Sequence, residues 1–123
     1  QRDSQVKLLI DGDAFPNLLK PILVRAVERT GLPAVVVANK RVRIGDGELW
    51  RYEIVEAGMD RADDRLAELA EEGDLVITAD IPLADRAVAK GAMALDHRGT
   101  LYTKENVKQY LAMRNLMDEI RST

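Results

Sequence analysis

Two aspartates follow the first apolar run of the chain. The stretch LLIDGDAFPNLL (8–19) places Asp11 and Asp13 between a predicted strand and a predicted helix, and the run DLVITA (74–79) is followed by Asp80. Crowded carboxylates repel one another unless a divalent cation neutralises them, and such a cation lowers the pKa of bound water beside a phosphodiester. The pattern therefore predicts a carboxylate metal site. Alternatively, Asp13 and Asp80 are only helix N-caps, each worth about 1 kcal/mol.

Further aspartates are candidates by their position. Asp63 and Asp64 begin a helix that leads to the second of these strands, and Asp85 lies one turn into the helix after Asp80. On a helical wheel Asp63 lies beside the apolar stripe, whereas Asp64 points away from it. A capping box with Asp60 as N-cap is the alternative for Asp63. We therefore expect Asp63 to bind metal before Asp64, and an exposed position explains Asp85 equally well.

Composition narrows the kind of metal. None of the 123 residues is cysteine and only one is histidine, which excludes disulfides, thiolate zinc sites and polyhistidine sites. A metal would therefore be Mg²⁺ or Mn²⁺ held by carboxylates. The net charge of −3 does not favour nucleic-acid binding, although 18 Lys and Arg residues are available to cluster on one face. The chain has neither a long apolar run nor a signal-peptide pattern, so we expect no membrane span and a cytoplasmic location.

Basic and polar residues after the predicted strands are candidates for binding substrate. These candidates are Asn39, Arg41, Arg43, Thr78, His97 and Arg98. Basic side chains at the carboxyl ends of these strands, Lys40 included, would contact phosphates without reading the base sequence. The alternatives are a solvated basic loop after the second strand and an ordinary loop histidine. Trp50 and Tyr52 are candidates for stacking on bases, but with so few aromatic residues in the chain, packing is the preferred interpretation.

Strands alternate with helices along the chain. We predict strands over 6–10, 32–39, 52–57, 74–79 and 92–95, helices over 18–29, 61–71, 81–90 and 104–122, and loops over 40–50 and 97–103. The last helix is expected to turn Val107, Leu111, Leu116 and Ile120 toward the core. The alternation predicts a three-layer α/β/α sandwich with a mostly parallel five-stranded sheet, as one domain over 1–123. Residues 1–5 are expected to be disordered or an engineered leader.

Four segments resemble the YaiI/YqxD family of bacterial proteins. They are DGDAFP (11–16), GMDRADDRLAELAEEGDLVITADIPLADRAVAKGA (58–92), ALDHRGTLYTKENV (94–107) and MRNLMDEIR (113–121). The resemblance covers nearly the whole chain, and GDLVITADIPLA with RGxLYTxENV is its most specific part. This uncharacterised family is usually placed among PIN-like folds, whose best-known members are metal-dependent ribonucleases, including toxins of toxin–antitoxin pairs.

The resemblance implies a strand order of 3-2-1-4-5, which would make the first and fourth strands neighbours. It matches the acids of PIN-like nucleases to Asp11 with Asp13, to Asp63 or Asp64, to Asp80 in Thr78-Ala79-Asp80, and to Asp85. Two features depart from the family pattern. Phe15 stands where the opening motif usually has cysteine, so no thiol chemistry is ascribed to this chain. The Gly/Pro-rich tail that often follows the last helix is absent from the sequence.

These observations predict a nuclease that depends on Mg²⁺ or Mn²⁺ and acts on RNA. A non-catalytic module that binds RNA or a protein is the main alternative, and an antitoxin-like partner or a homodimer stays open. A small phosphatase is a further alternative, because D-x-D after the first strand also occurs in haloacid-dehalogenase-type enzymes. Phe15 stands where that motif requires Thr or Val, which disfavours it.

Overall fold

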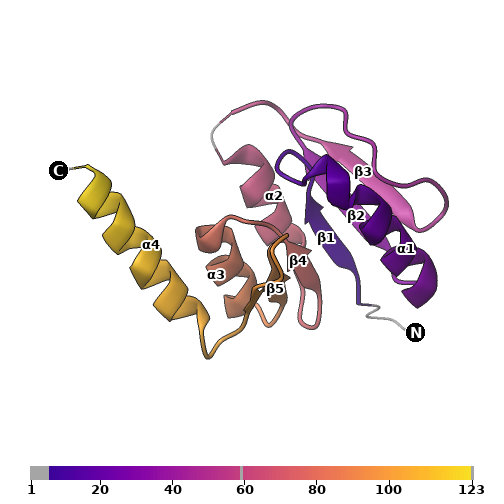
Figure 1. Ribbon diagram of the computed structural model, residues 1–123. Helices are drawn as coiled ribbons and strands as arrows, with labels where there is room; N and C mark the ends of the chain where they lie inside the picture. Colours follow the sequence, from indigo (N-terminus) through magenta and orange to yellow (C-terminus); the bar gives the residue numbers. More distant parts are fainter. Residues whose placement is uncertain (1–5, 59, 123) are drawn as a thin grey trace.

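The computed structural model describes residues 6–58 and 60–122 and contains one six-stranded sheet and four α-helices (Figure 1). The expectation for residues 1–5 lies outside the described residues. In chain order the elements are β1 (Leu8–Asp11), the 3₁₀-helix η1 (Asn17–Leu19), α1 (Lys20–Thr30), β2 (Ala34–Ala38), β3 (Trp50–Ile54), α2 (Arg61–Leu69), β4 (Leu75–Ile77), α3 (Ile81–Ala89), β5 (Met93–Leu95), β6 (Leu101–Tyr102) and α4 (Val107–Arg121).

The sheet has the strand order β3-β2-β1-β4-β5-β6, which confirms the predicted order and adds one strand. All pairs are parallel except β5 with β6. The prediction of a loop throughout 97–103 was therefore wrong at β6. The strand forms because Asp96 holds a tight turn: its carboxylate accepts hydrogen bonds from the Arg98 and Thr100 amides and from the Tyr102 hydroxyl. A two-residue strand of this kind has too short a pattern to be predicted from sequence.

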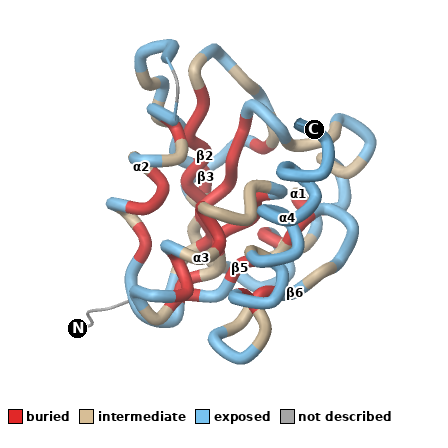
Figure 2. Tube along the Cα trace, turned by 90° about the vertical axis from the view of Figure 1, so that its left-hand side faces the viewer, coloured by how far each residue is buried: buried red, intermediate tan, exposed pale blue. Residues whose placement is uncertain are grey.

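Alternate strand residues build the cores on the two faces of the sheet. Leu9 and Val76 pack with Leu66 of α2 and Leu83 of α3, whereas Leu8 and Ile10 pack on the opposite face, where α1 lies. The strands β1 and β2 are buried at every position, as strands covered on both faces should be. The structure thus has the three predicted α/β/α layers, and the strand interiors form the most buried part of the trace (Figure 2).

The first helix begins later than predicted. Pro16 precedes η1, and α1 starts at Lys20 with Pro21 in its first turn, where the missing amide costs little. Only Leu23 and Val27 of α1 are buried, and Leu18, which precedes the helix, is 90% exposed. A left-handed Gly31 ends the helix after Thr30, close to the predicted end at residue 29.

The last helix extends away from the sheet (Figure 1). Val107 is buried and Leu111 is half-buried, but Leu116 and Ile120 are exposed, so the prediction that these two face the core was wrong. Near its start the helix is joined to α3 by the ion pair of Lys108 with Asp85, and Tyr110 meets Tyr102 of β6 edge to face. Over the described part of the chain, no helix combines the length and apolar character that a membrane span requires.

Candidate active site at the carboxyl edge of the sheet

The carboxyl ends of β1 and β4 lie side by side at the point where the strand order reverses. Ile10 is paired with Ile77, so the next residues along the two strands, Asp11 and Thr78, lie at the same level of this edge. The chain runs from β1 to β2 on one side and reaches β4 on the other. In open parallel sheets this switch point is where ligands bind, because the connections diverge and leave a crevice.

Asp11 is buried and is held by its neighbour across the strand pair. The Thr78 hydroxyl donates a hydrogen bond to Asp11 Oδ2 at 3.2 Å, and the Asp80 amide donates to Thr78 Oγ1 at 3.0 Å. Burial raises the pKa of Asp11, and the charges of Asp13 and Asp80 add to this effect against the hydrogen bond from Thr78. Thr78 is itself buried, so its hydroxyl holds Asp11 and the backbone just before α3 in place.

Asp13 is fixed by the neighbouring strand. Its Oδ2 accepts a hydrogen bond from the Asn39 amide at 2.8 Å, at the end of β2. The alternative interpretation of Asp13 as an N-cap was therefore wrong, because the following helix begins several residues later. The chain turns between the two aspartates at Gly12, where a Cβ would lie 2.7 Å from Val36 Cγ1. A residue without a side chain is needed here so that the turn can lie directly against β2.

Asp63 on α2 brings a third carboxyl to this edge. Its pKa is raised to about 7, first by burial and then by the charges of Asp80 and Asp11, with a hydrogen bond to the Asp80 carboxyl and the charge of Asp60 adding to the shift. Asp63 lies in the first turn of α2, beside the buried Ala62 and Leu66. The helical wheel therefore placed this side chain correctly.

Asp80 is the N-cap of α3, as the alternative interpretation held. Its Oδ1 accepts a hydrogen bond from the Leu83 amide at 2.8 Å. The same carboxyl contacts Asp63 and contributes to the raised pKa of Asp11. Asp80 therefore caps α3 and also belongs to the acidic group, so the N-cap and metal-site interpretations do not exclude each other.

The two other acidic candidates are engaged elsewhere. Asp64 is exposed and forms an ion pair with Arg86 of α3 at 2.8 Å, which agrees with the prediction that it faces solvent. Asp85 forms an ion pair with Lys108 of α4 at 2.8 Å. Both carboxylates thus tie helices together, and the structure does not bring them to the acidic group.

A cleft of about 200 Å³ opens at this edge, and its acidic lining is formed by Asp11, Asp13, Asp60 and Asp63. These are oxygen ligands of the kind that Mg²⁺ and Mn²⁺ prefer, so the donor set fits such a cation. As the side chains are arranged, no three acidic or histidine side chains within 6–58 and 60–122 are placed to hold a metal ion together. The fit therefore lies in the chemistry of the donors and in their uncompensated charge, and binding would require them to move closer together.

The substrate-binding candidates divide between separate surfaces. Asn39 lines the acidic cleft and donates its side-chain amide to the Glu56 carbonyl. Arg41 and Arg43 line a second hollow beside β3. His97 lies with Asp11 and Thr78 around a hollow of only about 10 Å³, and Arg98 lines an apolar groove next to α1. The structure thus keeps Asn39 at the cleft and His97 close to it, and it places Arg98 in other surroundings.

A known protein family matches the part of the chain that contains the residues of this cleft. The family model described as "Uncharacterized BCR, YaiI/YqxD family" matches residues 9–123. The chain belongs to this family. The segments around Asp11, Asp63 and Asp80 all lie within the matched range.

Several bacterial relatives named "UPF0178 protein" cover almost the whole chain. The relative from Sulfurimonas denitrificans is 62% identical over 118 residues, which are 96% of this chain and 78% of the relative. The relative from Sulfurovum sp. is 60% identical over 116 residues, covering 94% and 78%, and the one from Geobacter sp. is 52% identical over 117 residues, covering 95% and 76%. No solved structure matches the chain.

Two residues at the cleft of this family member were missed by sequence reasoning. Asp60 has a left-handed backbone with φ 63°, makes no capping hydrogen bond and lines the cleft instead. Arg61 also lines the cleft and pairs with Glu56 at 3.2 Å. The only available signal was their position just before Asp63. An aspartate before a helix predicts a cap, and the left-handed turn that redirects Asp60 has no sequence signature here.

Proposed function

We propose that the chain hydrolyses phosphodiester bonds in RNA at the acidic cleft, with Mg²⁺ or Mn²⁺ as cofactor. One observation carries the proposal. Carboxyls from β1, from α2 and from the end of β4 gather at the switch point, where burial and then the charges of Asp80 and Asp11 raise the pKa of Asp63 to about 7. Arg61 also lines the cleft, but it is paired with Glu56. A bound cation would relieve the repulsion among the carboxyls.

Each residue of the cleft would have a separate role in binding the cation or the substrate. Asp11, Asp13, Asp63 and Asp80 would hold the cation, which when bound supplies charge neutralisation and a lowered pKa for water. Thr78 keeps Asp11 oriented, and Asn39 keeps Asp13 oriented through its amide. Before a cation binds, Asp63, whose pKa is about 7, is the carboxyl best able to hold a proton at neutral pH. Asn39, Arg41 and His97 would position phosphates, whereas Arg43 is paired with Asp46.

A cleavage assay on single-stranded RNA with Mn²⁺, against the same reaction with EDTA, tests the proposal. We expect cleavage that needs the metal and falls at least about 100-fold in Asp63→Asn, since one metal or proton-transfer group contributes roughly that much. Asp64→Asn is the matched control, because its carboxylate lies one residue away and pairs with Arg86. Equal activity of wild type and Asp63→Asn would identify a contaminating nuclease and contradict the proposal.

A non-catalytic binding module is the second candidate. It is favoured by the absence, among the residues that the structure describes, of three acidic side chains already placed to hold a metal. Such a module would bind RNA or a protein in EDTA and would keep its ligand in Asp80→Asn. Binding without cleavage under every metal condition would therefore select this alternative.

A further inference from the structure

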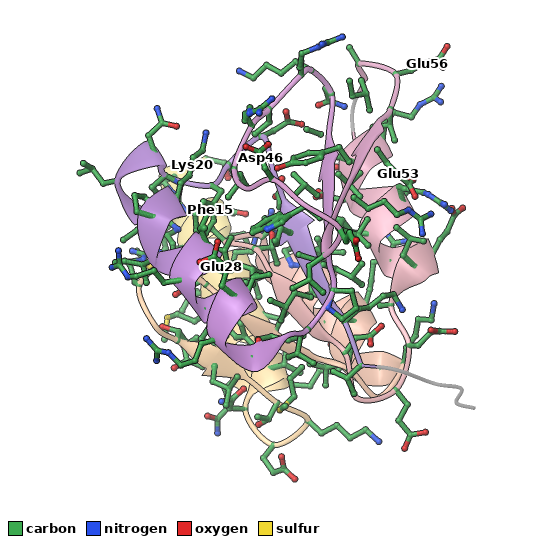
Figure 3. The ribbon with its side chains drawn as sticks, turned by 90° about the vertical axis from the view of Figure 1, so that its right-hand side faces the viewer. Phe15, Lys20, Glu28, Asp46, Glu53 and Glu56 are labelled. Carbon is green, nitrogen blue, oxygen red and sulfur yellow. The ribbon has the colours of Figure 1, made fainter. Side chains whose placement is uncertain are left out.

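A hollow of about 320 Å³ lies beside the edge strand β3, apart from the acidic cleft. Its basic side is the loop after β2, with Lys40, Arg41 and Arg43, and Tyr52 of β3 provides an aromatic surface. Figure 3 labels two further residues of the lining, Asp46 in the loop and Glu53 on β3. A volume of this size is at the lower end of small-ligand sites, which corresponds to one nucleotide unit.

The Tyr52 ring is fixed in place before any ligand binds. Its hydroxyl accepts hydrogen bonds from the Ile44 amide at 3.1 Å and the Gly45 amide at 2.9 Å, and donates to the Gly45 carbonyl. The ring stacks with Trp50 at a centroid distance of 6.4 Å. A Cβ at Gly45 would lie 2.3 Å from the Trp50 ring, so only glycine lets the loop lie this close. Tyr52 as a residue is still 38% exposed, so its clamped ring can stack on a base with little loss of side-chain entropy.

The charges around the ring leave cations available for an anion. Asp46 is paired with Arg43 at 2.7 Å, and Glu53 with Arg65 of α2 at 2.7 Å. Lys40 and Arg41 make no ion pair with any residue in 6–58 or 60–122, and both border the hollow. The acids of the lining are thus neutralised within the protein, while two cations are left to attract a phosphate.

The hollow and the acidic cleft meet along one short segment of chain. Ala38 lines the hollow, and the next residue, Asn39, lines the cleft and donates its amide to Asp13. A ligand strand that crosses the end of β2 would therefore contact both surfaces. Neighbouring nucleotides of one strand lie close enough together to occupy two adjoining sites of this kind.

We propose that this hollow binds one nucleotide of a single-stranded nucleic acid, with its base stacked on Tyr52 and its phosphate paired with Lys40 and Arg41. The proposal rests on the proposed function, because it supplies the strand whose next phosphodiester reaches the acidic cleft. Trp50 lies behind Tyr52 and supports the stacking surface. Stacking tolerates any base, so this subsite would give affinity with little sequence preference.

Fluorescence anisotropy with a short labelled single-stranded RNA in EDTA tests the proposal without cleavage. We expect Arg41→Gln to weaken binding about five- to tenfold and to lower the slope of log affinity against log salt by about one, since one phosphate contact is lost. Tyr52→Leu should weaken binding about tenfold or more, and Tyr52→Phe should retain most of the affinity. Arg29→Gln, which removes an equal charge on α1, should bind as wild type does.

Ultraviolet cross-linking followed by peptide mass spectrometry provides a readout that does not depend on the folding of Tyr52→Leu. We expect the wild-type protein to cross-link at Tyr52. A cross-link confined to other segments, no RNA binding by wild type, or equal binding by wild type, Arg41→Gln and Tyr52→Leu would each overturn the proposal. The same titration with single-stranded DNA shows whether the ribose hydroxyl contributes.

Failure of this proposal is distinguishable from failure of the proposed function. Asp63→Asn should bind RNA in EDTA at least as well as wild type, because Asp63 is in the cleft and outside the hollow. Metal-dependent cleavage that is insensitive to Tyr52→Leu would contradict the nucleotide subsite alone. Binding that depends on Tyr52 and Arg41, with no cleavage under any metal condition, would contradict the catalytic proposal alone.

Discussion

At the scale of single residues, Asp63 is the carboxyl of the site whose pKa is most strongly raised. Its folded pKa of about 7 is above the ordinary value of 3.8, so the folded state favours the protonated form. A raised pKa contributes most stability below the unfolded pKa, and that contribution is lost as pH rises through 7. The metal-free protein should therefore lose stability between about pH 4 and pH 7 because of this group.

Asp63→Asn should remove this loss. Three pKa units correspond to about 4 kcal/mol, and we reduce this to roughly 1–2 kcal/mol because the side chain is only half-buried and solvent screens its neighbours. Urea unfolding in EDTA should show the variant more stable by that amount near pH 8 and equal to wild type near pH 4. Asp64→Asn should show no such pH-dependent gain. A wild type that is as stable as Asp63→Asn near pH 8 would contradict the crowding of these carboxyls.

Residue types and spacing could predict which aspartates gather, but not how each is held. Asp11 and Asp80 follow strands that are neighbours in the sheet, and Asp63 lies beside an apolar stripe, so all three were predictable. Asp13 was predicted as well, but its hydrogen bond was not, because its partner is the backbone amide of Asn39, 26 residues along the chain. Every residue except proline has a backbone amide, so the residue type at position 39 does not predict this hydrogen bond.

At the scale of elements, the start of α3 combines a cap with a site residue. Asp80→Asn keeps an oxygen for the Leu83 amide and removes a charge from the acidic group, so we expect no loss of stability. Asp80→Ala removes the cap as well and should be less stable than Asp80→Asn by about 1 kcal/mol. Chemical denaturation of both variants at neutral pH measures the difference. Equal stability of the two would mean that the cap contributes nothing in the folded protein.

The elements themselves were largely predictable because their patterns are long. Apolar runs marked β1 and β2, and helical spacing marked α1. The errors lie where tertiary structure overrides the local pattern. The exposed Leu116 follows helical spacing in α4, but the ion pair that joins this helix to α3 lies near its start. Periodicity predicts which side chains share a face, and whether another element covers that face depends on the whole fold.

At the scale of the whole molecule, acids at the two edges of the sheet have different surroundings. Asp74, at the amino end of β4, is buried and accepts hydrogen bonds from the Lys7 amide, the Glu71 amide and Lys7 Nζ, the last at 2.7 Å. This carboxylate is neutralised and joins the starts of β1 and β4. At the opposite edge, the acids of the cleft face one another. Sequence alone does not separate these two roles, because Asp74 and Asp80 flank the same strand.

Removing the positive charge of Lys7 at the amino end of the sheet should therefore destabilise the protein. Lys7→Met leaves the Asp74 carboxylate buried beside an apolar chain and should destabilise the protein by about 2–4 kcal/mol. Differential scanning calorimetry at neutral pH measures the loss. The double variant Lys7→Met/Asp74→Asn should recover part of it, because no buried charge is then left unpaired. A loss no larger than that of the exposed variant Arg29→Gln would contradict this account of the edge.

A metal site in the acidic cleft is tested by titrating Mn²⁺ into the metal-free protein. Isothermal titration calorimetry should show binding by wild type with release of protons near pH 7, because Asp63 must ionise to accept the cation. Asp63→Asn and Asp13→Asn should bind at least tenfold more weakly, and Asp85→Asn, whose carboxylate pairs with Lys108, should bind as wild type does. Absence of binding by wild type, or equal binding by wild type and Asp63→Asn, would contradict a metal site in this cleft.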